Sequence, residues 1–444
     1  MKTPIADFVK QYAESDFSRF HMPGHKGKSF LGLEKYDITE IAGADVLSDA
    51  EGIIYESEKN ASELFKTAHT YYCAGGSSSA ICAMLALVRG EKKPLILAAR
   101  NVHKAFIHAC TLLDFDIGWI MPRRCSTILK CTVTAQMVEE KILTAHKKVS
   151  AVYLTSPDYL GNLQNIPDIA RVCKKHNIPL LVDNAHGAYL SFLEKSLHPI
   201  CLGATVCCDS AHKTLPVLTG GAYLHISKDA PRDFTKNARQ CLSLFSSTSP
   251  SYLILQSLDL CNAYLEDKFK KELNGCIKRI ESLKDFITKS GFCVLESEPL
   301  KITIDAHASG YTGDELAQIL RQNMGEAEFY DNRFIVLMLT PQNGERDFDR
   351  LKEMFSSLKA KKPITEENIT LAYPKIKMSV REAFFNDAEI IDAYSAQGRI
   401  CAKATVSCPP AVPIAISGEE ITNEIIKLFM LYGIEKISVI KKED

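Results

Sequence analysis

The segment AGGSSSA at residues 74–80 lies between a predicted strand and a predicted helix. Its glycines would let the backbone approach an anion closely. The serine hydroxyls and the free N–H groups of the helix's first turn can all donate hydrogen bonds to a phosphate. An ordinary turn with a serine at the helix N-cap fits the same residues. Ser77, Ser78 and Ser79 are therefore candidate phosphate ligands, and this segment alone leaves both interpretations open.

A second segment is an apolar run at 180–182 that ends in an acid, Asp183, with a histidine, His186, three residues later. In open α/β sheets the residues that face ligands lie just past the carboxyl ends of strands. A carboxylate there can pair with the protonated ring nitrogen of a cofactor, which is how pyridoxal phosphate (PLP) is kept an electron sink. An aspartate that caps the next turn, or a metal site, would also fit these residues.

Lys213 lies in a third segment, DSAHKT at 209–214, directly after an apolar run at 205–208. Partial desolvation in an enclosed polar loop favours the neutral, nucleophilic form of a lysine amine. Most lysines are instead solvated surface groups, which is the alternative here. Ser210 and His212 flank Lys213, and the glycines at 220 and 221 would let the chain wrap around a ligand.

The order of the three segments favours one interpretation, because a phosphate cradle, an acid and a lysine follow one another within one α/β region. Thirty residues separate Asp183 from Lys213. Fold-type I PLP enzymes have this order, with about 30 residues between the acid and the lysine. We therefore predict a PLP enzyme whose cofactor is carried by Lys213 and paired with Asp183, and we predict no metal.

The elements that would position these residues alternate from about residue 70 to about residue 226. The predicted strands are apolar throughout, so both of their faces are expected to be covered, as in a mostly parallel sheet between helices. The predicted strands are 71–73, 95–98, 151–155, 180–182, 205–208 and 222–225, and the predicted helices are 78–88, 104–113, 135–146 and 167–176. The pattern predicts an α/β fold with an aminotransferase-like large domain of fold type I.

The pattern of apolar and polar residues changes after residue 226. A long helical pattern at 253–290 precedes a smaller α+β region, which has predicted strands near 300–304 and 334–338 and a predicted helix near 315–323. A charged stretch with a proline at 359–368 resembles a linker. We predict three domains: an N-terminal arm with the PLP-binding large domain at 1–300, a small α+β domain at 301–360, and a C-terminal domain at 361–444.

The amino-acid composition limits the kinds of molecule that we expect this chain to bind. The 444 residues include 53 basic and 54 acidic side chains, and this balance indicates neither a nucleic acid nor a membrane surface as partner. No stretch approaches the ~20 apolar residues that cross a bilayer. Fifteen cysteines without a C-x-x-C pair indicate free thiols in a reducing compartment. We expect a cytoplasmic enzyme that binds a small molecule and further copies of its own chain.

Several further segments, in order along the chain, resemble one family. They are HMPGHKG at 21–27, DITE at 37–40, RNVHK at 100–104, DNAHG at 183–187, SAHKT at 210–214, STSPSY at 247–252 and GRI at 398–400. Together they resemble the short form of the Orn/Lys/Arg decarboxylases, from about residue 4 to the end of the chain. The HMPGHK and S-x-H-K-T segments are the specific ones.

The resemblance implies roles around the cofactor ring. Lys213 would carry PLP as a Schiff base and later donate or accept a proton, and Asp183 would pair with the ring nitrogen. His103 would stack on the ring, and His186 would lie beside it. These assignments make Lys213, His103 and Asp183 the predicted catalytic residues.

The resemblance also implies a phosphate site. Ser77, Ser78 and Ser210, together with His212, would hold the phosphate or its surroundings, and Ser79 belongs to the same cradle. Thr248 lies in a segment that reaches the partner subunit's cofactor phosphate in this family. A homodimer or higher homo-oligomer is therefore expected.

The sequence departs from the family pattern where the substrate would be set. Asn184 and Lys403 each stand where the family usually has Glu, and CPPAVP at 408–413 replaces Y-P-P-G-I-P. Lys403 reverses a charge in a region expected to face a basic side chain. His21 and His25 could serve the active site or fix the N-terminal arm.

The predicted function is decarboxylation of arginine, lysine or ornithine, giving a polyamine precursor or a diamine plus carbon dioxide. Arginine and lysine are favoured because the short form is generally assigned those substrates. An aminotransferase or another PLP lyase is one alternative, and product analysis distinguishes it. A weakly active paralogue that binds partner subunits is the other, and the altered C-terminal motif supports it.

Overall fold

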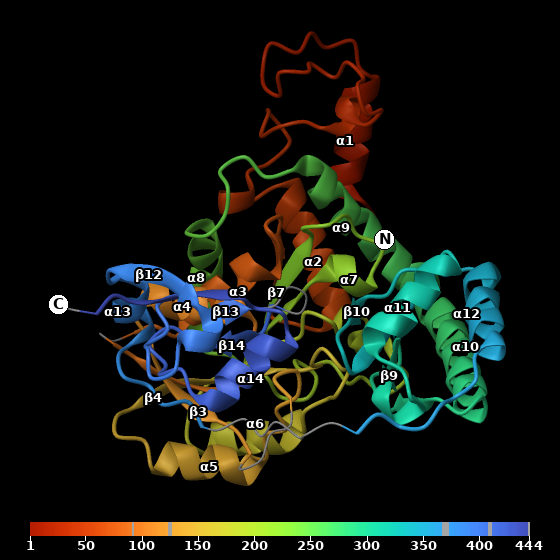
Figure 1. The fold of residues 1–444 in the computed structure, drawn as a ribbon. Helices are drawn as coiled ribbons and strands as arrows, with labels where there is room; N and C mark the ends of the chain where they lie inside the picture. Colours follow the sequence, from red (N-terminus) through yellow and green to blue (C-terminus); the bar gives the residue numbers. More distant parts are fainter. Residues whose placement is uncertain (91–92, 123–126, 366–372, 407–410, 443–444) are drawn as a thin grey trace. The chain divides into compact units, whose positions relative to one another are not determined.

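The computed structural model describes residues 1–90, 93–122, 127–365, 373–406 and 411–442. Figure 1 labels its helices and strands. The chain divides into two compact units. Unit 1 comprises Met1–Gly90 and Ile166–Lys271, and unit 2 comprises Glu91–Asn165 and Glu272–Asp444. Among the described residues, none of the helices combines the length and the apolar character that a membrane crossing requires.

Unit 1 holds the three segments that the sequence singles out. Its elements are α1 (Pro4–Glu14), α2 (Ile53–Phe65), β1 (His69–Cys73), α3 (Gly76–Leu87), α6 (Ile166–Lys175), β5 (Leu180–Asp183), β6 (Val206–Asp209), α7 (Ala211–Thr214), β7 (Ala222–Ile226), α8 (Arg232–Ser243) and α9 (Tyr252–Tyr264). Every residue of its four strands is buried. The prediction that these apolar runs are covered on both faces is thus confirmed.

Unit 2 contains the remaining strands and the C-terminal region. Its elements are β2 (Leu95–Ala99), α4 (Lys104–Leu113), β3 (Asp116–Ile120), α5 (Ala135–Leu143), β4 (Val149–Thr155), α10 (Lys270–Lys289), β8 (Cys293–Leu295), β9 (Lys301–Asp305), α11 (Gly313–Gln322), β10 (Phe329–Tyr330), β11 (Phe334–Met338), α12 (Glu345–Ser357), α13 (Val380–Phe385), β12 (Ala388–Asp392), β13 (Thr405–Val406), β14 (Pro413–Ala415), α14 (Asn423–Leu431) and β15 (Lys436–Ile440).

The main sheet has seven strands in the order β1-β7-β6-β5-β4-β2-β3. The β5–β6, β2–β4 and β2–β3 pairs are parallel, whereas β7 runs antiparallel to both β6 and β1. A mostly parallel sheet with intervening helices confirms the predicted α/β fold class. β5 and β6 follow one another in the chain and lie side by side, with Asp183 opposite Cys208.

Unit 2 also carries the smaller sheets of the C-terminal half. A four-stranded antiparallel sheet has the order β10-β11-β9-β8, and two-stranded sheets pair β12 with β15 and β13 with β14. A capping box begins α11, since Thr312 accepts a hydrogen bond from the backbone of Glu315 and Glu315 accepts one from Thr312. These elements confirm the predicted strands near 300–304 and 334–338 and the predicted helix near 315–323.

The predicted helix at 253–290 is a single helical run with one irregularity. A π-helical turn, Leu265–Phe269, separates α9 from α10. The sequence missed β3, which is an edge strand. Its first three residues are half-buried and include Asp116 and Gly118, so it lacks the uninterrupted apolar run of the inner strands.

The domain boundaries at 300 and 360 stay predictions, because the two compact units each combine distant parts of the chain. Part of the predicted linker, 366–368, lies outside the described residues, as do positions 408–410 of the CPPAVP segment. The described cysteines are all free thiols, and most are buried.

Candidate active site

The carboxyl ends of β5 and β6 place two of the predicted catalytic residues. Asp183 is the last residue of β5, and its side chain is buried. The chain leaves β6 at Asp209 and enters the short helix α7, which carries Lys213. Because parallel strands end at the same edge of the sheet, Asp183 and α7 belong to one edge of unit 1.

Lys213 and His186 are in direct contact. The Nζ atom of Lys213 lies 3.0 Å from Nε2 of His186, within hydrogen-bond distance. His186 is buried, and Lys213 is half-buried. The alternative that Lys213 is an ordinary solvated surface lysine does not fit this environment.

The carboxylate of Asp183 accepts hydrogen bonds from the turn that follows it and from the neighbouring strand β6. Oδ1 accepts a hydrogen bond of 3.1 Å from the Ala185 backbone N–H and a weak one of 3.7 Å from the Cys208 thiol. With 2% of its surface exposed, Asp183 has no access to bulk water. A buried carboxylate at this position can hold a proton on a cationic ring nitrogen.

The glycine- and serine-rich segment forms the amino-terminal turn of α3. The Oγ atoms of Ser210 and Ser77 lie 2.7 Å apart and join this turn to the loop before Lys213. Gly76 has a φ of +74°, and a Cβ atom there would meet nothing within 4 Å. Among the described residues no side chain caps α3. The Gly76 N–H donates to the Gly220 carbonyl at 2.7 Å, and the hydroxyls and following N–H groups at this helix N-terminus are suited to a phosphate.

The other predicted members of this cradle have different surroundings. Ser78 is exposed, and Ser79 is buried with its hydroxyl donating to the Gly75 carbonyl at 3.3 Å. The ring of His212 is fixed by Nδ1, 2.9 Å from the Gly221 carbonyl. Burial lowers the pKa of His212. Thr248 is exposed.

His103 belongs to unit 2, where it is the N-cap of α4. Its Nδ1 atom accepts a hydrogen bond of 3.1 Å from the Ala105 backbone N–H. Nearby in the RNVHK segment, the buried Arg100 donates to the carbonyls of Pro413 and Ile414 at 2.7 and 2.9 Å. This segment is therefore tied to β14 in the C-terminal region.

The two histidines of the HMPGHKG segment contact other parts of the N-terminal arm. His25 Nε2 lies 3.2 Å from a carboxylate oxygen of Asp37, which joins this segment to DITE. His21 Nε2 lies 2.6 Å from the Tyr12 hydroxyl. These contacts fit the interpretation in which both histidines fix the arm.

Two of the residues that differ from the family pattern, Lys403 and Asn184, make side-chain contacts in the structure. Lys403 lies with Nζ 5.7 Å from the centre of the Phe384 ring, a cation–π contact. Asn184 donates a hydrogen bond of 2.7 Å to the buried carboxylate of Asp209. The sequence assigned no role to Asp209, although a charged residue at the end of an apolar strand was the available signal.

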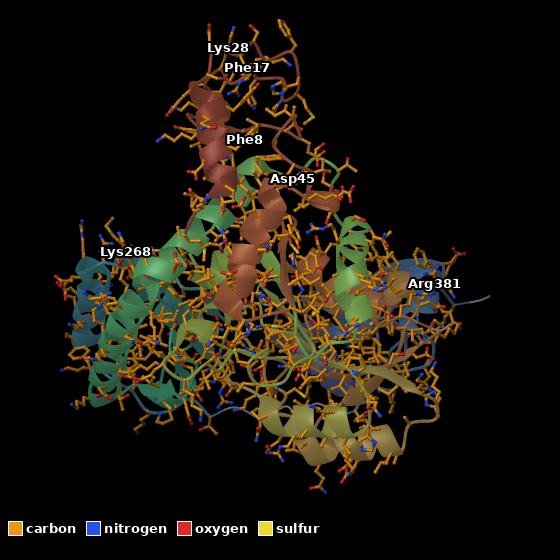
Figure 2. All side chains as sticks on the ribbon, turned by 180° about the vertical axis from the view of Figure 1, so that it is seen from behind. Phe8, Phe17, Lys28, Asp45, Lys268 and Arg381 are labelled. Atoms are coloured by element: carbon orange, nitrogen blue, oxygen red, sulfur yellow. The ribbon has the colours of Figure 1, made fainter. Side chains whose placement is uncertain are left out.

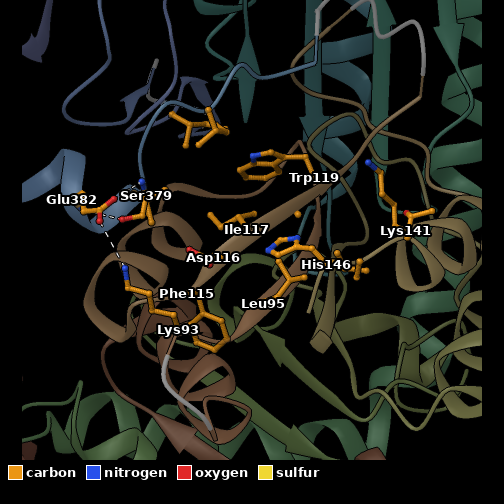
Figure 3. Close-up of a pocket in the computed structure, with 17 residues that line it drawn as sticks. Lys93, Leu95, Phe115, Asp116, Ile117, Trp119, Lys141, His146, Ser379 and Glu382 are labelled. Carbon is orange, nitrogen blue, oxygen red and sulfur yellow. Dashed lines mark hydrogen bonds and ion pairs between the residues drawn. The ribbon is translucent and has the colours of Figure 1, made fainter. Parts of the chain in front are cut away.

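Unit 2 contains a separate cavity of about 450 Å³ beside the edge strand β3 (Figure 3). Trp119, Phe115 and Val380 are among its apolar lining, and Lys93 lies 3.8 Å from Glu382 at its rim. The residues that line this cavity include none of the predicted site residues.

The residues of unit 1 fit PLP on chemical grounds. A half-buried amine, a buried carboxylate at the neighbouring strand end, and a hydroxyl pair at an uncapped helix N-terminus are the three groups that its aldehyde, ring nitrogen and phosphate require. The fold and this set of residues define a fold-type I PLP enzyme.

Comparisons with known proteins agree with this class. The Orn/Lys/Arg decarboxylase major domain matches residues 3–307, so the chain belongs to the Orn/Lys/Arg decarboxylase family. Members of this family are PLP-dependent carboxy-lyases, and the chain is an enzyme of that kind.

Individual relatives cover nearly the whole chain. The uncharacterized protein YaaO of Bacillus subtilis is 30% identical over 96% of this chain and 93% of its own length. The arginine decarboxylase of the same organism is 28% identical over 95% of this chain and 92% of its own length. The lysine decarboxylase LdcF of Francisella novicida has the same fold, with a TM-score of 0.82 at 18% identity, over 99% of this chain and 81% of that chain.

Proposed function

We propose that this enzyme decarboxylates arginine or lysine, with Lys213 as the residue that carries PLP. The observation that carries the proposal is the Lys213–His186 contact at the strand ends, beside the buried Asp183 and the Ser77–Ser210 hydroxyl pair. The 28% identity to an arginine decarboxylase over nearly the full chain supports arginine as the first substrate to test. The product would be a polyamine precursor or a diamine.

When bound, PLP supplies an electron sink for the pair of electrons left on Cα as carbon dioxide departs. Asp183 maintains that sink, because its buried carboxylate favours a proton on the ring nitrogen. Lys213 would hold the cofactor, and its amine would be the group that donates the proton taken up at Cα. His186 orients the Lys213 amine through their 3.0 Å contact.

The proton balance of the reaction follows from the bonds that change. The bond between Cα and the carboxylate breaks, carbon dioxide leaves, and one proton is taken up at Cα. Each turnover therefore consumes one proton and needs no keto acid, unlike transamination. His212, Ser77 and Ser210 hold the phosphate side of the site, with the partial positive charge of the α3 N-terminus.

We further propose a cytoplasmic homodimer. The loop that follows α1 extends away from the rest of unit 1, and Figure 2 labels Phe17 and Lys28 in it. Phe20, Phe30 and Leu31 of this loop are 95%, 84% and 89% exposed. Large apolar side chains exposed together indicate a protein interface. Free cysteines support a reducing compartment.

The experiment compares the wild type with Lys213→Ala after addition of PLP. An absorbance band of lysine-bound cofactor is expected in the wild type and not in the variant. Arginine, lysine and ornithine are then supplied in turn, with carbon dioxide and amine products measured. Carbon dioxide from arginine or lysine supports the proposal. A band without carbon dioxide from any of the three would contradict the substrate, and a band unchanged in Lys213→Ala would contradict the role of Lys213.

A further inference from the structure

The carboxylate of Asp209 accepts hydrogen bonds from four side chains in the interior of unit 1. His198 and His225 each approach Oδ2 with Nε2 at 3.0 Å. Asn184 donates to Oδ1 at 2.7 Å, and the Cys207 thiol donates more weakly at 3.5 Å. The two histidine side chains and Asp209 have no exposed surface. We call Asp209, Asn184, His198 and His225 the Asp209 cluster.

The direction of these hydrogen bonds follows from the Asp209 carboxylate, which can only accept, so Nε2 of each histidine donates to it. Nδ1 of His225 lies 2.9 Å from the Thr70 hydroxyl, and Nδ1 of His198 accepts from the Ile200 backbone N–H at 3.4 Å. Burial lowers the pKa of His225, which keeps its ring neutral. Each Nδ1 is thus an acceptor, and the proton of each ring lies on Nε2, facing Asp209. Although burial would raise it, interactions with His198 and His225 hold the pKa of Asp209 well below its ordinary value.

The cluster joins three neighbouring strands and one loop at the edge that carries the predicted catalytic residues. Asn184 directly follows Asp183 at the end of β5, Asp209 ends β6, and His225 lies in β7. His198 comes from the loop before β6. Asp209 is four residues before Lys213, so its carboxylate fixes both chain segments that leave the sheet toward the site.

The side-chain amide of Asn184 complements the Asp209 carboxylate, because an amide N–H can donate a hydrogen bond to it. Its amide is packed against Gly187, where a Cβ atom would lie 2.0 Å from Asn184 Oδ1. A carboxylate side chain at 184 would face the ionised Asp209 at hydrogen-bond distance, and two like charges so close cannot both stay ionised. An amide donor therefore suits position 184 in this chain.

We propose that Asp209 is a positioning residue for Asp183 and Lys213, and that Asn184 is its matched donor. The proposal rests on the assignment of PLP to Lys213. Asp209 acts through the ends of β5 and β6 and does not touch the reacting atoms. A displacement of about 1 Å in catalytic groups can lower a rate roughly 100-fold, so positioning at this distance has a measurable effect.

A metal ion is the competing explanation for this cluster. One ligand atom each from His198, Cys207 and Asp209 lie within 4.8 Å of one another. In the described structure, however, both ring nitrogens that face Asp209 donate to it, and their other nitrogens accept hydrogen bonds. The hydrogen-bonded arrangement therefore satisfies these groups. A stoichiometric metal in the purified holoenzyme, lost in Asp209→Asn, would overturn the proposal.

The test is a double-mutant cycle on the PLP-loaded enzyme. Asp209→Asn turns an acceptor oxygen into a donor that faces other donors, and kcat is expected to fall roughly 100-fold. Asn184→Asp creates a pair of facing carboxylates, and kcat is expected to fall about tenfold, most strongly at high pH. The double variant N184D/D209N restores one donor and one acceptor between the two positions. Recovery of about tenfold over D209N is expected, a coupling typical of residues in contact.

Two readouts separate positioning from a general loss of stability. The pH midpoint of the lysine-bound cofactor's absorbance and the dissociation constant of PLP should both change in Asp209→Asn. The control is Asp331→Asn, because Asp331 accepts two backbone N–H bonds and the Tyr432 hydroxyl within unit 2. It should lower the melting temperature and leave the absorbance midpoint and kcat unchanged.

A folded Asp209→Asn variant with unchanged kcat, PLP affinity and absorbance midpoint would overturn the proposal. A double variant whose kcat is no higher than that of D209N would also overturn the proposal. If Asp209→Asn fails to fold, Thr70→Val tests the same network from its far end, with smaller effects of about threefold expected in the same direction. The absorbance and PLP measurements need no amino-acid substrate. They therefore test Asp209 even if the proposed substrate is wrong, whereas an unchanged band in Lys213→Ala would identify failure of the proposed function instead.

Discussion

At the scale of single residues, the Ser77–Ser210 pair links two segments that are 133 positions apart in the sequence. One serine begins α3, and the other precedes Lys213. If both hydroxyls turn toward the cofactor phosphate, each contributes a hydrogen bond to a charged group. Such bonds are worth about 1.5–3 kcal/mol, more than those between neutral groups.

We expect Ser210→Ala to weaken PLP binding about tenfold, since 1.4 kcal/mol corresponds to a factor of ten. The dissociation constant would be measured by titrating cofactor-free protein with PLP. Ser243→Ala is the matched control, because the hydroxyl of this exposed serine donates only to the Gln240 carbonyl in α8. Equal PLP affinity in Ser210→Ala and the wild type would contradict the phosphate role of Ser210.

The sequence could identify the residue types of the site but not their contacts. Asp183 and Lys213 can be picked out because charged residues that follow an apolar run mark a strand end. β5 ends at Asp183, and β6 ends at Asp209, four residues before Lys213. The Lys213–His186 contact depends on how two turns fold over one sheet edge. The partners of Asp209 come from three distant segments, so no local pattern could reveal them.

At the scale of elements, the inner strands and helices such as α4 and α11 follow from the sequence because their local and long-range preferences agree. The predicted helix at 104–113 and the predicted strand at 334–338 match α4 and β11 residue for residue. The edge strand β3 could not be predicted, since its pairing with β2 depends on tertiary contacts. The π-helical turn at Leu265–Phe269 likewise could not be predicted from the spacing of the apolar residues.

One carboxylate in the loop after α1 binds three consecutive backbone N–H groups. Glu34 accepts hydrogen bonds from the backbone N–H groups of Phe30, Leu31 and Gly32 at 2.8, 2.5 and 3.0 Å. These bonds, that of Leu31 first, lower the pKa of Glu34 to about 2. Because this folded-state value lies below the ordinary 4.5, the ionised carboxylate stabilises the loop above pH ~4.5. The stabilisation is lost as the pH falls from ~4.5 toward ~2.

We expect the backbone amides of Phe30, Leu31 and Gly32 to lose hydrogen-exchange protection over that pH range in the wild type. Glu34→Gln should show low protection throughout, without the pH-dependent change. Glu315→Gln provides a control, since it removes the carboxylate of the α11 capping box and should leave these three amides unaffected. Protection that is the same at pH 2.5 and pH 6 in the wild type would contradict the role of Glu34.

At the scale of the whole molecule, the N-terminal arm holds two of the segments that resemble the family, HMPGHKG and DITE. HMPGHKG and DITE contact each other through His25 and Asp37, and α1 is anchored by Asp259, which accepts the backbone N–H groups of Ile5 and Ala6 at 2.9 Å each. The sequence indicated an arm but could not show that its aromatic side chains are exposed. That exposure is what points to a second copy of the chain.

The last prediction concerns this second copy. Burial of a large apolar side chain stabilises by about 1.5–3 kcal/mol, so replacing both Phe20 and Leu31 by serine should weaken the dimer by at least about 3 kcal/mol, or roughly 100-fold. Sedimentation velocity over a dilution series would give the dissociation constant. Leu143→Ser is the control, because Leu143 is also well exposed, at 69%, but lies on α5 in unit 2. If the arm forms the interface, only the arm variant dissociates, and its activity falls with dilution if Thr248 reaches the partner's site, as the family resemblance implies. A wild type that is monomeric, or an arm variant as dimeric as the wild type, would show that the exposed aromatic side chains serve another purpose.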